Sequence, residues 1–203
     1  MILTYTILII LWLSLIVYAV LGGADFGGGI WDFFASGHGA QRQRRLIAQA
    51  LGPVWEANHV WLIFLIVGLF TAFPSAFSVL STALIVPFTL AVIGIVLRGA
   101  AFIFHAQTEE TGTLSKIWGR VFSTASTITP FFFGTAAAAV ASGQVRMQGG
   151  VVQTDLLAGW TTTPFALTIG ALALTLCALL AAVNLIVEAQ NSNDAELVAA
   201  FRR

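Results

Sequence analysis

Charged residues are scarce in this chain. Only 9% of its 203 residues are Asp, Glu, Lys or Arg, whereas 58% are hydrophobic and the mean hydropathy is +0.92. That leaves too little polar surface to solubilise a globule of this size, so the composition excludes a water-soluble domain. The nine basic and nine acidic residues cancel, and no basic stripe indicates nucleic-acid binding. The chain is expected to lie in a membrane.

Cysteine and the common catalytic motifs are also lacking. The single Cys177 lies inside an apolar run, so no disulfide framework exists and a packing role is expected. The Gly22–Gly29 run has no preceding strand and no following Lys-Ser/Thr, which excludes a phosphate loop. No CxxC, HExxH or nucleophile–base pair is present. His38, His59 and His105 are not paired at helical spacing and read as loop or interface histidines. No catalytic, cofactor-binding or metal-ligating residue is therefore predicted.

Long apolar stretches make up most of the rest. They are Ile2–Ala24, Ala57–Phe73, Ala76–Leu97, Ile117–Ala141 and Phe165–Val187. About 20 apolar residues span a hydrocarbon core as a helix, in which all backbone groups are satisfied internally. The predicted fold is all-α: one polytopic bundle of about five transmembrane helices over residues 1–203. The first stretch is too long for a signal peptide and lacks a basic leader and cleavage site.

Basic residues predict the orientation of these helices. If the helices alternate in direction, one side receives Arg42, Arg44, Arg45, Arg98, Lys116, Arg120, Arg202 and Arg203. Only Arg146 lies opposite. The positive-inside rule then places the N-terminus outside and the C-terminus in the cytoplasm.

The connecting segments are expected to be simple. Thr71–Ala76, around Pro74, predicts a tight hairpin between the second and third spans. Ser142–Pro164 reads as an irregular outer loop, and the polar tail after Glu188 as a cytoplasmic linker.

Several charges are predicted to share one depth near the cytoplasmic face. Asp25 ends the first span, Glu56 precedes the second, and Arg98 ends the third. Arg120 and Glu188 read as helix-end charges that reach the headgroups. For the other three, a structural Asp25–Arg98 pair and a proton path are both open and compatible, because buried ionisable groups in membranes usually mark ion or proton paths.

The residues around these acids support close packing. Gly23 and Gly27 have the small-xxx-small spacing that brings helix backbones together. Pro53 suits the first turn of a helix, which would place Glu56 in that turn, where the helix dipole favours its anion. Trp55 and Trp61 are typical of a membrane interface.

Three segments together resemble a known family. They are Gly23–Trp31 (GADFGGGIW), Pro53–Leu62 (PVWEANHVWL) and Leu97–Phe102 (LRGAAF). In order and spacing they are similar to subunit II of the cytochrome bd-type ubiquinol oxidases, including the cyanide-insensitive branch. Members usually run to nearly twice this length, so the chain resembles the N-terminal half of such a subunit.

The resemblance implies a role in aerobic respiration in the bacterial plasma (inner) membrane. The family's complex reduces oxygen to water with electrons from quinol, and its haem b and haem d are held by subunit I. This chain would bind no cofactor itself, pack against subunit I, contact lipid and quinone, and contribute to a proton path from the cytoplasm. Asp25, Trp55, Glu56 and Arg98 match the family's positions, with Glu56 where many members carry Asp.

Two other functions remain open from the residues. A proton-coupled transporter would also use membrane carboxylates, but it tends to have broken helices with polar midplane residues. Here only Pro87 and Pro130 interrupt span interiors, and the midplane segments are apolar. The other alternative is a purely structural membrane scaffold.

Overall fold

The computed structural model describes residues 1–202 except 38, 108–111, 150, 154–159 and 161–162. Its elements are α1 (Ile2–Phe34), α2 (Ala40–Ala72), α3 (Pro74–Ala83), α4 (Ile85–Gln107), α5 (Thr113–Ala141), β1 (Arg146–Gln148), β2 (Val151–Gln153), α7 (Pro164–Asn191) and α8 (Ala195–Phe201). Five helices of this described part are long and apolar enough to cross a membrane. The predicted all-α polytopic bundle is confirmed.

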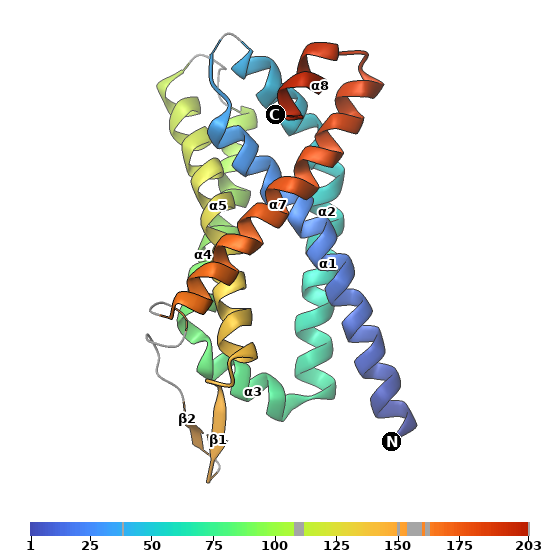
Figure 1. The fold of residues 1–203 in the computed structure, drawn as a ribbon, viewed down its shortest axis with the longest axis vertical. Coiled ribbons are helices and arrows are strands. Elements are labelled where there is room, and N and C mark those ends of the chain that lie inside the picture. The colour runs from blue at the N-terminus through green and yellow to red at the C-terminus, as the bar shows by residue number, and fades with distance from the viewer. Residues whose placement is uncertain (38, 108–111, 150, 154–159, 161–162, 203) are drawn as a thin grey trace.

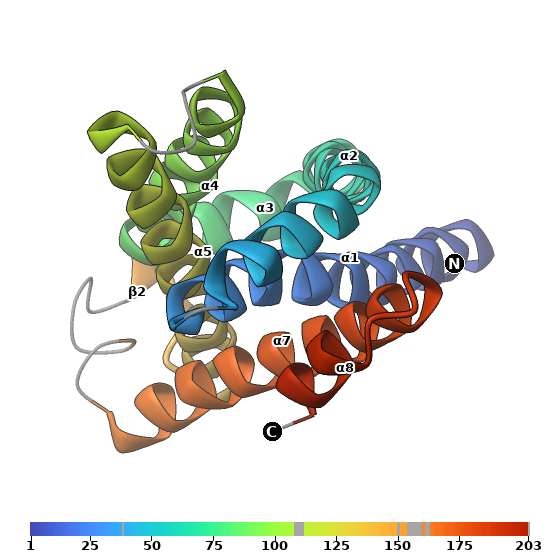
Figure 2. The same ribbon diagram turned by 90° about the horizontal axis from the view of Figure 1, so that it is seen from above.

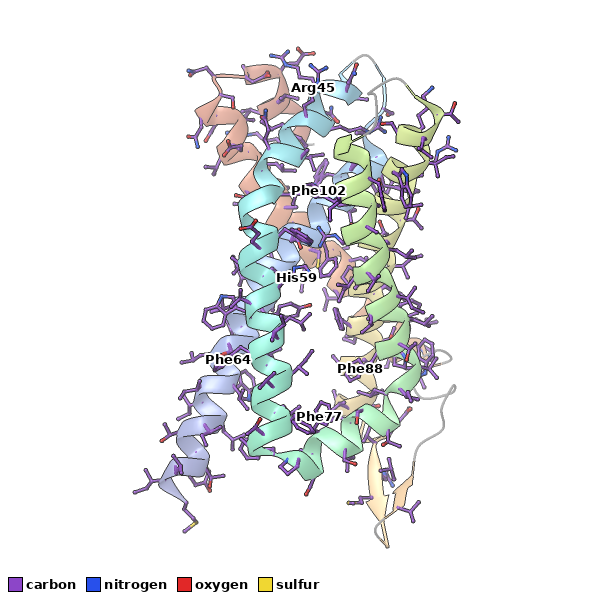
Figure 3. All side chains as sticks on the ribbon, turned by 180° about the vertical axis from the view of Figure 1, so that it is seen from behind. Arg45, His59, Phe64, Phe77, Phe88 and Phe102 are labelled. Atoms are coloured by element: carbon purple, nitrogen blue, oxygen red, sulfur yellow. The ribbon has the colours of Figure 1, made fainter. Side chains whose placement is uncertain are left out.

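The second half of α1, from Gly22 onward, is largely buried among the other helices. It packs against α2, α5 and α7, while α4 packs along α5. Figure 1 shows α1 and α7 crossing as an X, and Figure 2, seen from above, shows them lying side by side. The N-terminus lies at the end where α3 joins α2 to α4, and the C-terminus lies at the opposite end beside α8 (Figures 1 and 3).

The first span is longer than predicted. α1 has 33 residues and continues through the glycine run to Phe34, so the expected end at Ala24 is wrong. A glycine inside a helix costs about 0.5–1 kcal/mol relative to alanine. Here the glycines are buried between helices, and the packing that their small size permits offsets that cost.

The third span was also misplaced. Instead of one helix over Ala76–Leu97, a short α3 ends at Ala83 and α4 begins at Ile85. Pro87 explains the break, because its ring clashes with the carbonyl four residues earlier and it has no N–H to donate to that carbonyl. Proline is tolerated in the first turn of α4, because the N–H groups of a first turn have no partner within the helix. The second span begins earlier than expected as a helix, since α2 starts at Ala40, although its apolar part is Val54–Ala72.

Two connecting segments are more ordered than predicted. Within the expected irregular loop, β1 and β2 pair antiparallel with Met147 opposite Val152, and Trp160 is buried against Leu84 and Ala139. Positions 154–159 and 161–162 of that loop lie outside the described residues.

The tail is not an extended linker. After α7 ends at Asn191, α8 folds back onto the bundle, and Leu197 and Phe201 enter a core cluster with Leu46, Ile47, Leu51, Ala101, Phe122, Leu185 and Ala189. The Asp194 carboxylate caps α8 by accepting from the Leu197 N–H at 3.2 Å. It also pairs with Arg42 at the start of α2 at 2.5 Å. These contacts fix α8 against α2, which its sequence of mixed polarity does not show by itself.

Candidate functional site

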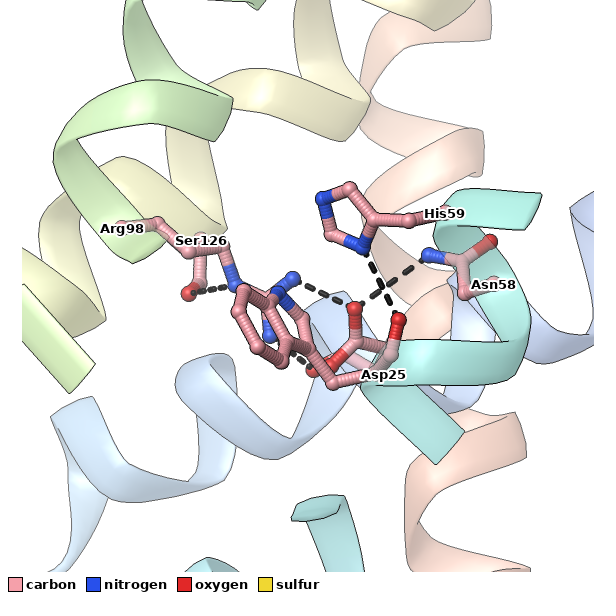
Figure 4. Close-up of polar contacts among 6 residues, drawn as sticks. Asp25, Asn58, His59, Arg98 and Ser126 are labelled. Carbon is pink, nitrogen blue, oxygen red and sulfur yellow. Dashed lines mark hydrogen bonds and ion pairs between the residues drawn. The ribbon is translucent and has the colours of Figure 1, made fainter. Parts of the chain in front are cut away.

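A fully buried ion pair lies where α1 and α4 face each other. Asp25 has no exposed surface and Arg98 is 2% exposed. The two guanidinium Nη atoms of Arg98 each donate to one carboxylate oxygen of Asp25 at 2.5 Å, and Nη2 also reaches the Asp25 carbonyl at 3.3 Å. Such two-pronged contacts are the strong form of a carboxylate–arginine pair. The predicted Asp25–Arg98 pairing is confirmed (Figure 4).

Two neighbouring helices complete the polar contacts of this pair. The Asn58 amide of α2 donates to Asp25 Oδ2 at 3.2 Å. Arg98 Nε donates to the hydroxyl of Ser126 on α5 at 3.1 Å. The rings of Phe26 and Phe122 lie 4.8 and 5.4 Å from the guanidinium carbon, which favours the cation. Four helices therefore meet at one charge pair.

The glycine run makes this meeting possible. A Cβ on Gly29 would lie 2.2 Å from the Ser126 Cβ, and one on Gly22 would lie 3.1 Å from the Asn58 amide oxygen. On the other side of α1, a Cβ on Gly27 would lie 2.0 Å from the Cys177 carbonyl oxygen of α7. The predicted close packing is confirmed, and it is satisfied by helices of this same chain.

The depth of the pair differs from the prediction. Asp25 and Arg98 were expected at the ends of their spans, but α1 continues to Phe34 and α4 to Gln107. Both residues lie inside their helices, because the glycine run after Asp25 and the segment after Arg98 remain helical. The pair is therefore enclosed by the bundle instead of lying at its rim.

Glu56 does not join this pair. Its side chain is exposed on α2, and among the described residues no hydrogen bond or ion pair connects it to Asp25 or Arg98. Because α2 begins at Ala40, Glu56 lies mid-helix, and the predicted first-turn dipole stabilisation is wrong. Trp55 turns inward instead: its ring lies 5.9 Å from that of Phe102, and a Cβ on Gly99 would lie 3.6 Å from it.

The remaining predicted residues are peripheral. Arg120 is exposed on α5 and Glu188 is half-buried on α7. Nδ1 of His59 lies 2.8 Å from the Trp55 carbonyl, to which it can only donate. The side chains of His38 and His105 lie outside the described residues. In the described part of the chain, no group of three or more His, Cys, Asp or Glu could hold a metal ion.

A second buried carboxylate, Asp32, was missed by the sequence analysis. It lies in the last turn of α1, accepts a hydrogen bond from the Ser123 hydroxyl of α5, and pairs with Arg44 Nε at 3.2 Å. Asp32 follows Asp25 by two helical turns, so the two lie on one face of α1. The seven-residue spacing of Asp25 and Asp32 is visible in the sequence, but it places them on one face only if the first helix extends past Ala24.

Within the described part of the chain, two buried polar atoms near the pair have no hydrogen-bond partner. They are the Tyr18 hydroxyl, two turns before Asp25 on α1, and the Asn58 amide oxygen. Orphaned atoms of this kind are costly and in native proteins are usually satisfied by buried water. The polar character of the site therefore extends beyond the ion pair along α1.

A sequence profile of the family described as cytochrome bd terminal oxidase subunit II matches residues 3–203. The chain belongs to this family. This membership agrees with the resemblance of the Gly23–Trp31, Pro53–Leu62 and Leu97–Phe102 segments.

Individual proteins similar to this chain are also subunits of cytochrome bd oxidases. Over 129 residues the chain is 32% identical to cytochrome bd ubiquinol oxidase subunit 2 of Bacillus subtilis, covering 61% of this chain and 37% of that protein. It is 28% identical to cytochrome bd-I ubiquinol oxidase subunit 2 of Escherichia coli K12, covering 60% and 31%. The fold matches a chain of the bd oxidase from Geobacillus thermodenitrificans with a TM-score of 0.79 at 23% identity, covering 99% of this chain and 61% of that one. The matches thus span about a third of the length of the curated relatives.

Proposed function

We propose that the chain is a haem-free subunit of a bd-type quinol:oxygen oxidoreductase. In this role it packs against a haem-bearing partner in the bacterial inner membrane and contributes to a proton path from the cytoplasm. The observation that carries the proposal is the buried Asp25–Arg98 pair in a chain of this family. A purely structural pair offers little, since buried ion pairs can often be replaced by apolar residues without loss of stability. Ionisable groups inside membranes are usually functional.

Glu56 supports a partner on the outer face of α2. Its carboxylate is exposed within the apolar span Val54–Ala72, next to the exposed Val60 and Ile63. A carboxylate facing lipid is costly, so we infer that this face meets a polar group of the partner. The Trp55 ring of α2 lies 5.9 Å from that of Phe102, one turn along α4 from Arg98.

The donor groups of the described residues do not fit a metal centre. The His59 ring meets the Trp55 ring edge-to-face and is bonded to its own helix, and no cluster of metal-binding side chains exists in the described ranges. Following the family resemblance, we assign haem b and haem d, and the reduction of oxygen by quinol, to the partner subunit. The part of this chain is to hold α1, α2 and α4 together around groups that can accept and release protons.

The test is co-purification through a tag on this chain, expressed with its natural partner. Haem absorbance and quinol-dependent oxygen consumption, measured with ubiquinol and menaquinol analogues, should follow the tag. Asp25→Asn should slow oxygen consumption per haem while the haem spectrum persists. Isolation without a haem protein, together with proton-driven transport in vesicles, would favour the transporter. Full turnover in an assembled Asp25→Asn complex would exclude a proton-path role for Asp25 and favour a purely structural scaffold.

A further inference from the structure

We propose that Asp32 is the first proton acceptor of this chain at the cytoplasmic end, and that Ser123 and Ser126 of α5 connect it to the Asp25–Arg98 pair. The proposal rests on the proposed function and adds a route to it. Asp32 lies outside the three segments that resemble the family, since it directly follows the first of them, Gly23–Trp31.

The position of Asp32 is electrostatically unfavourable for a purely structural acid. It lies in the last turn of α1, where the helix dipole opposes a negative charge, and it is 9% exposed. Arg44 offsets this cost from one side at 3.2 Å, and Arg44 itself is about half exposed, at 48%. The buried carboxylate thus contacts a side chain that is itself exposed at that end of the bundle. A proton from solvent can reach Asp32 there.

Hydroxyl groups of α5 continue inward from Asp32. The Ser123 hydroxyl has one hydrogen and two acceptors for it, the Asp32 carboxylate and the Gly119 carbonyl at 2.8 Å. A hydroxyl that can rotate between acceptors can accept one proton while giving up another. Ser126 lies one turn further along the same face of α5, and its oxygen accepts from Arg98 Nε at 3.1 Å.

Gly29 places this line directly against α1. It lies between Asp25 and Asp32 in the sequence, and a Cβ there would come within 2.3 Å of the Ser126 hydroxyl oxygen. Ser123 and Ser126 are both buried, at 3% and 0% exposed. Two buried hydroxyls on the facing helix therefore lie between the two acids: Ser123 contacts Asp32, and Ser126 contacts Arg98, the partner of Asp25.

The line continues past the ion pair. The unpartnered Tyr18 hydroxyl and Asn58 amide oxygen lie on the far side of Asp25 along α1 and on α2. Buried atoms of this kind recruit water, which can carry a proton onward toward the partner. In each passage Asp32 takes one proton from water, gives it to the hydroxyl and water chain, and returns to the carboxylate. Glu56, exposed on the outer face of α2, is not part of this line.

The experiment compares variants in the purified complex with its haem-bearing partner. Asp32→Asn should lower turnover per haem by about 100-fold or more, in the range typical of a lost proton-transfer group, and should raise the solvent deuterium isotope effect. Asp32→Glu should retain most of the turnover. Acetate should accelerate Asp32→Ala, because a small acid can replace the missing carboxyl group. The matched control is Asp194→Asn, which removes another buried, arginine-paired carboxylate near the same end and should leave turnover unchanged.

Outcomes separate this inference from the proposed function. Full turnover in Asp32→Asn alongside a slow Asp25→Asn overturns the Asp32 route alone. Full turnover in both variants overturns the proton path of the proposed function as well. If Asp32→Asn fails to assemble, Ser123→Ala decides, since it keeps the Arg44 pair but removes a hydroxyl from the line: unchanged turnover and isotope effect overturn the route, and a slower rate with a larger isotope effect supports it.

Discussion

At the residue scale, the Asp25–Arg98 pair concentrates two charges in a space with no solvent contact. Each charge is tolerated only because the other is present, and because Asn58, Ser126 and two aromatic rings surround them. Attraction between such charges roughly repays the cost of removing them from water, whereas either charge alone is left uncompensated. The two residues should therefore behave as one unit under mutation.

We predict a non-additive mutant cycle for this pair. Arg98→Met or Asp25→Leu alone should destabilise the complex by about 3–5 kcal/mol, the range for breaking a buried ion pair. The double variant should be more stable than either single variant, because no unpaired charge is left in the bundle. Thermal unfolding of the purified complex, with haem content recorded, measures this. A double variant as unstable as the sum of the two would contradict it.

Glu56 carries a different expectation, because it is exposed mid-helix. Glu56→Gln should slow quinol-driven oxygen consumption in membranes normalised for haem, while the haem spectrum remains intact. Glu56→Asp should keep much of the activity, since it retains the acid and shortens the reach by one methylene. Full activity in the Gln variant would reduce Glu56 to a surface charge, and loss of haem from the complex would show that its contact with the partner serves assembly instead of proton transfer.

At the element scale, the crossing of α1 and α7 depends on one absent side chain. The backbone of α7 approaches Gly27 so closely that a Cβ would lie 2.0 Å from the Cys177 carbonyl oxygen. On the opposite side of the same helix, Gly28 and Gly29 accommodate Leu51 of α2 and Ser126 of α5. Displacing α7 would therefore also disturb the face of α1 that carries Asp25.

We predict opposite effects for two alanine substitutions. Gly27→Ala should destabilise the complex by at least about 1–3 kcal/mol, the cost of overpacking. Gly52→Ala on α2, where nothing lies within 4 Å of the new Cβ, should be neutral or stabilising by about 0.5–1 kcal/mol through helix propensity. Both are measured by thermal unfolding of the same preparation. Equal melting temperatures would show that the α1–α7 contact is looser than the structure has it.

At the scale of the whole molecule, the basic residues are concentrated at one end of the bundle. The start of α2 carries Arg42, Arg44 and Arg45, and the start of α5 carries Lys116 and Arg120. These helix starts lie at the α8 end, whereas β1, which begins with Arg146, lies at the other (Figure 1). By the positive-inside rule the α8 end should face the cytoplasm.

Site-directed labelling tests this orientation. In a Cys177→Ala background, Met147→Cys on β1 should react with a membrane-impermeant maleimide in right-side-out vesicles. Ser192→Cys, before α8, should react only in inverted vesicles. Both native side chains are exposed, so accessibility within the protein does not bias the comparison. The reverse pattern would invert the proposed topology, including the direction of the proton path.

The sequence alone was sufficient for features that depend on composition and local spacing. Apolar runs of membrane length predicted the five spans, and the glycine spacing predicted close helix contact. The Asp25–Arg98 pairing was also predictable, because two opposite charges in an apolar chain have few other ways to be satisfied. The family motifs followed from the order of rare residues.

Tertiary structure decided what hydropathy could not. Packing against α2, α5 and α7 keeps the glycine run helical, so α1 reaches Phe34 and brings Asp32 onto the face of Asp25. Contacts of Leu197 and Phe201 fold α8 back onto the bundle. The exposure of Glu56 follows from which face of α2 packs on α1. In each case contacts between segments distant in the sequence outweigh local propensity. Such contacts cannot be inferred from a window of consecutive residues.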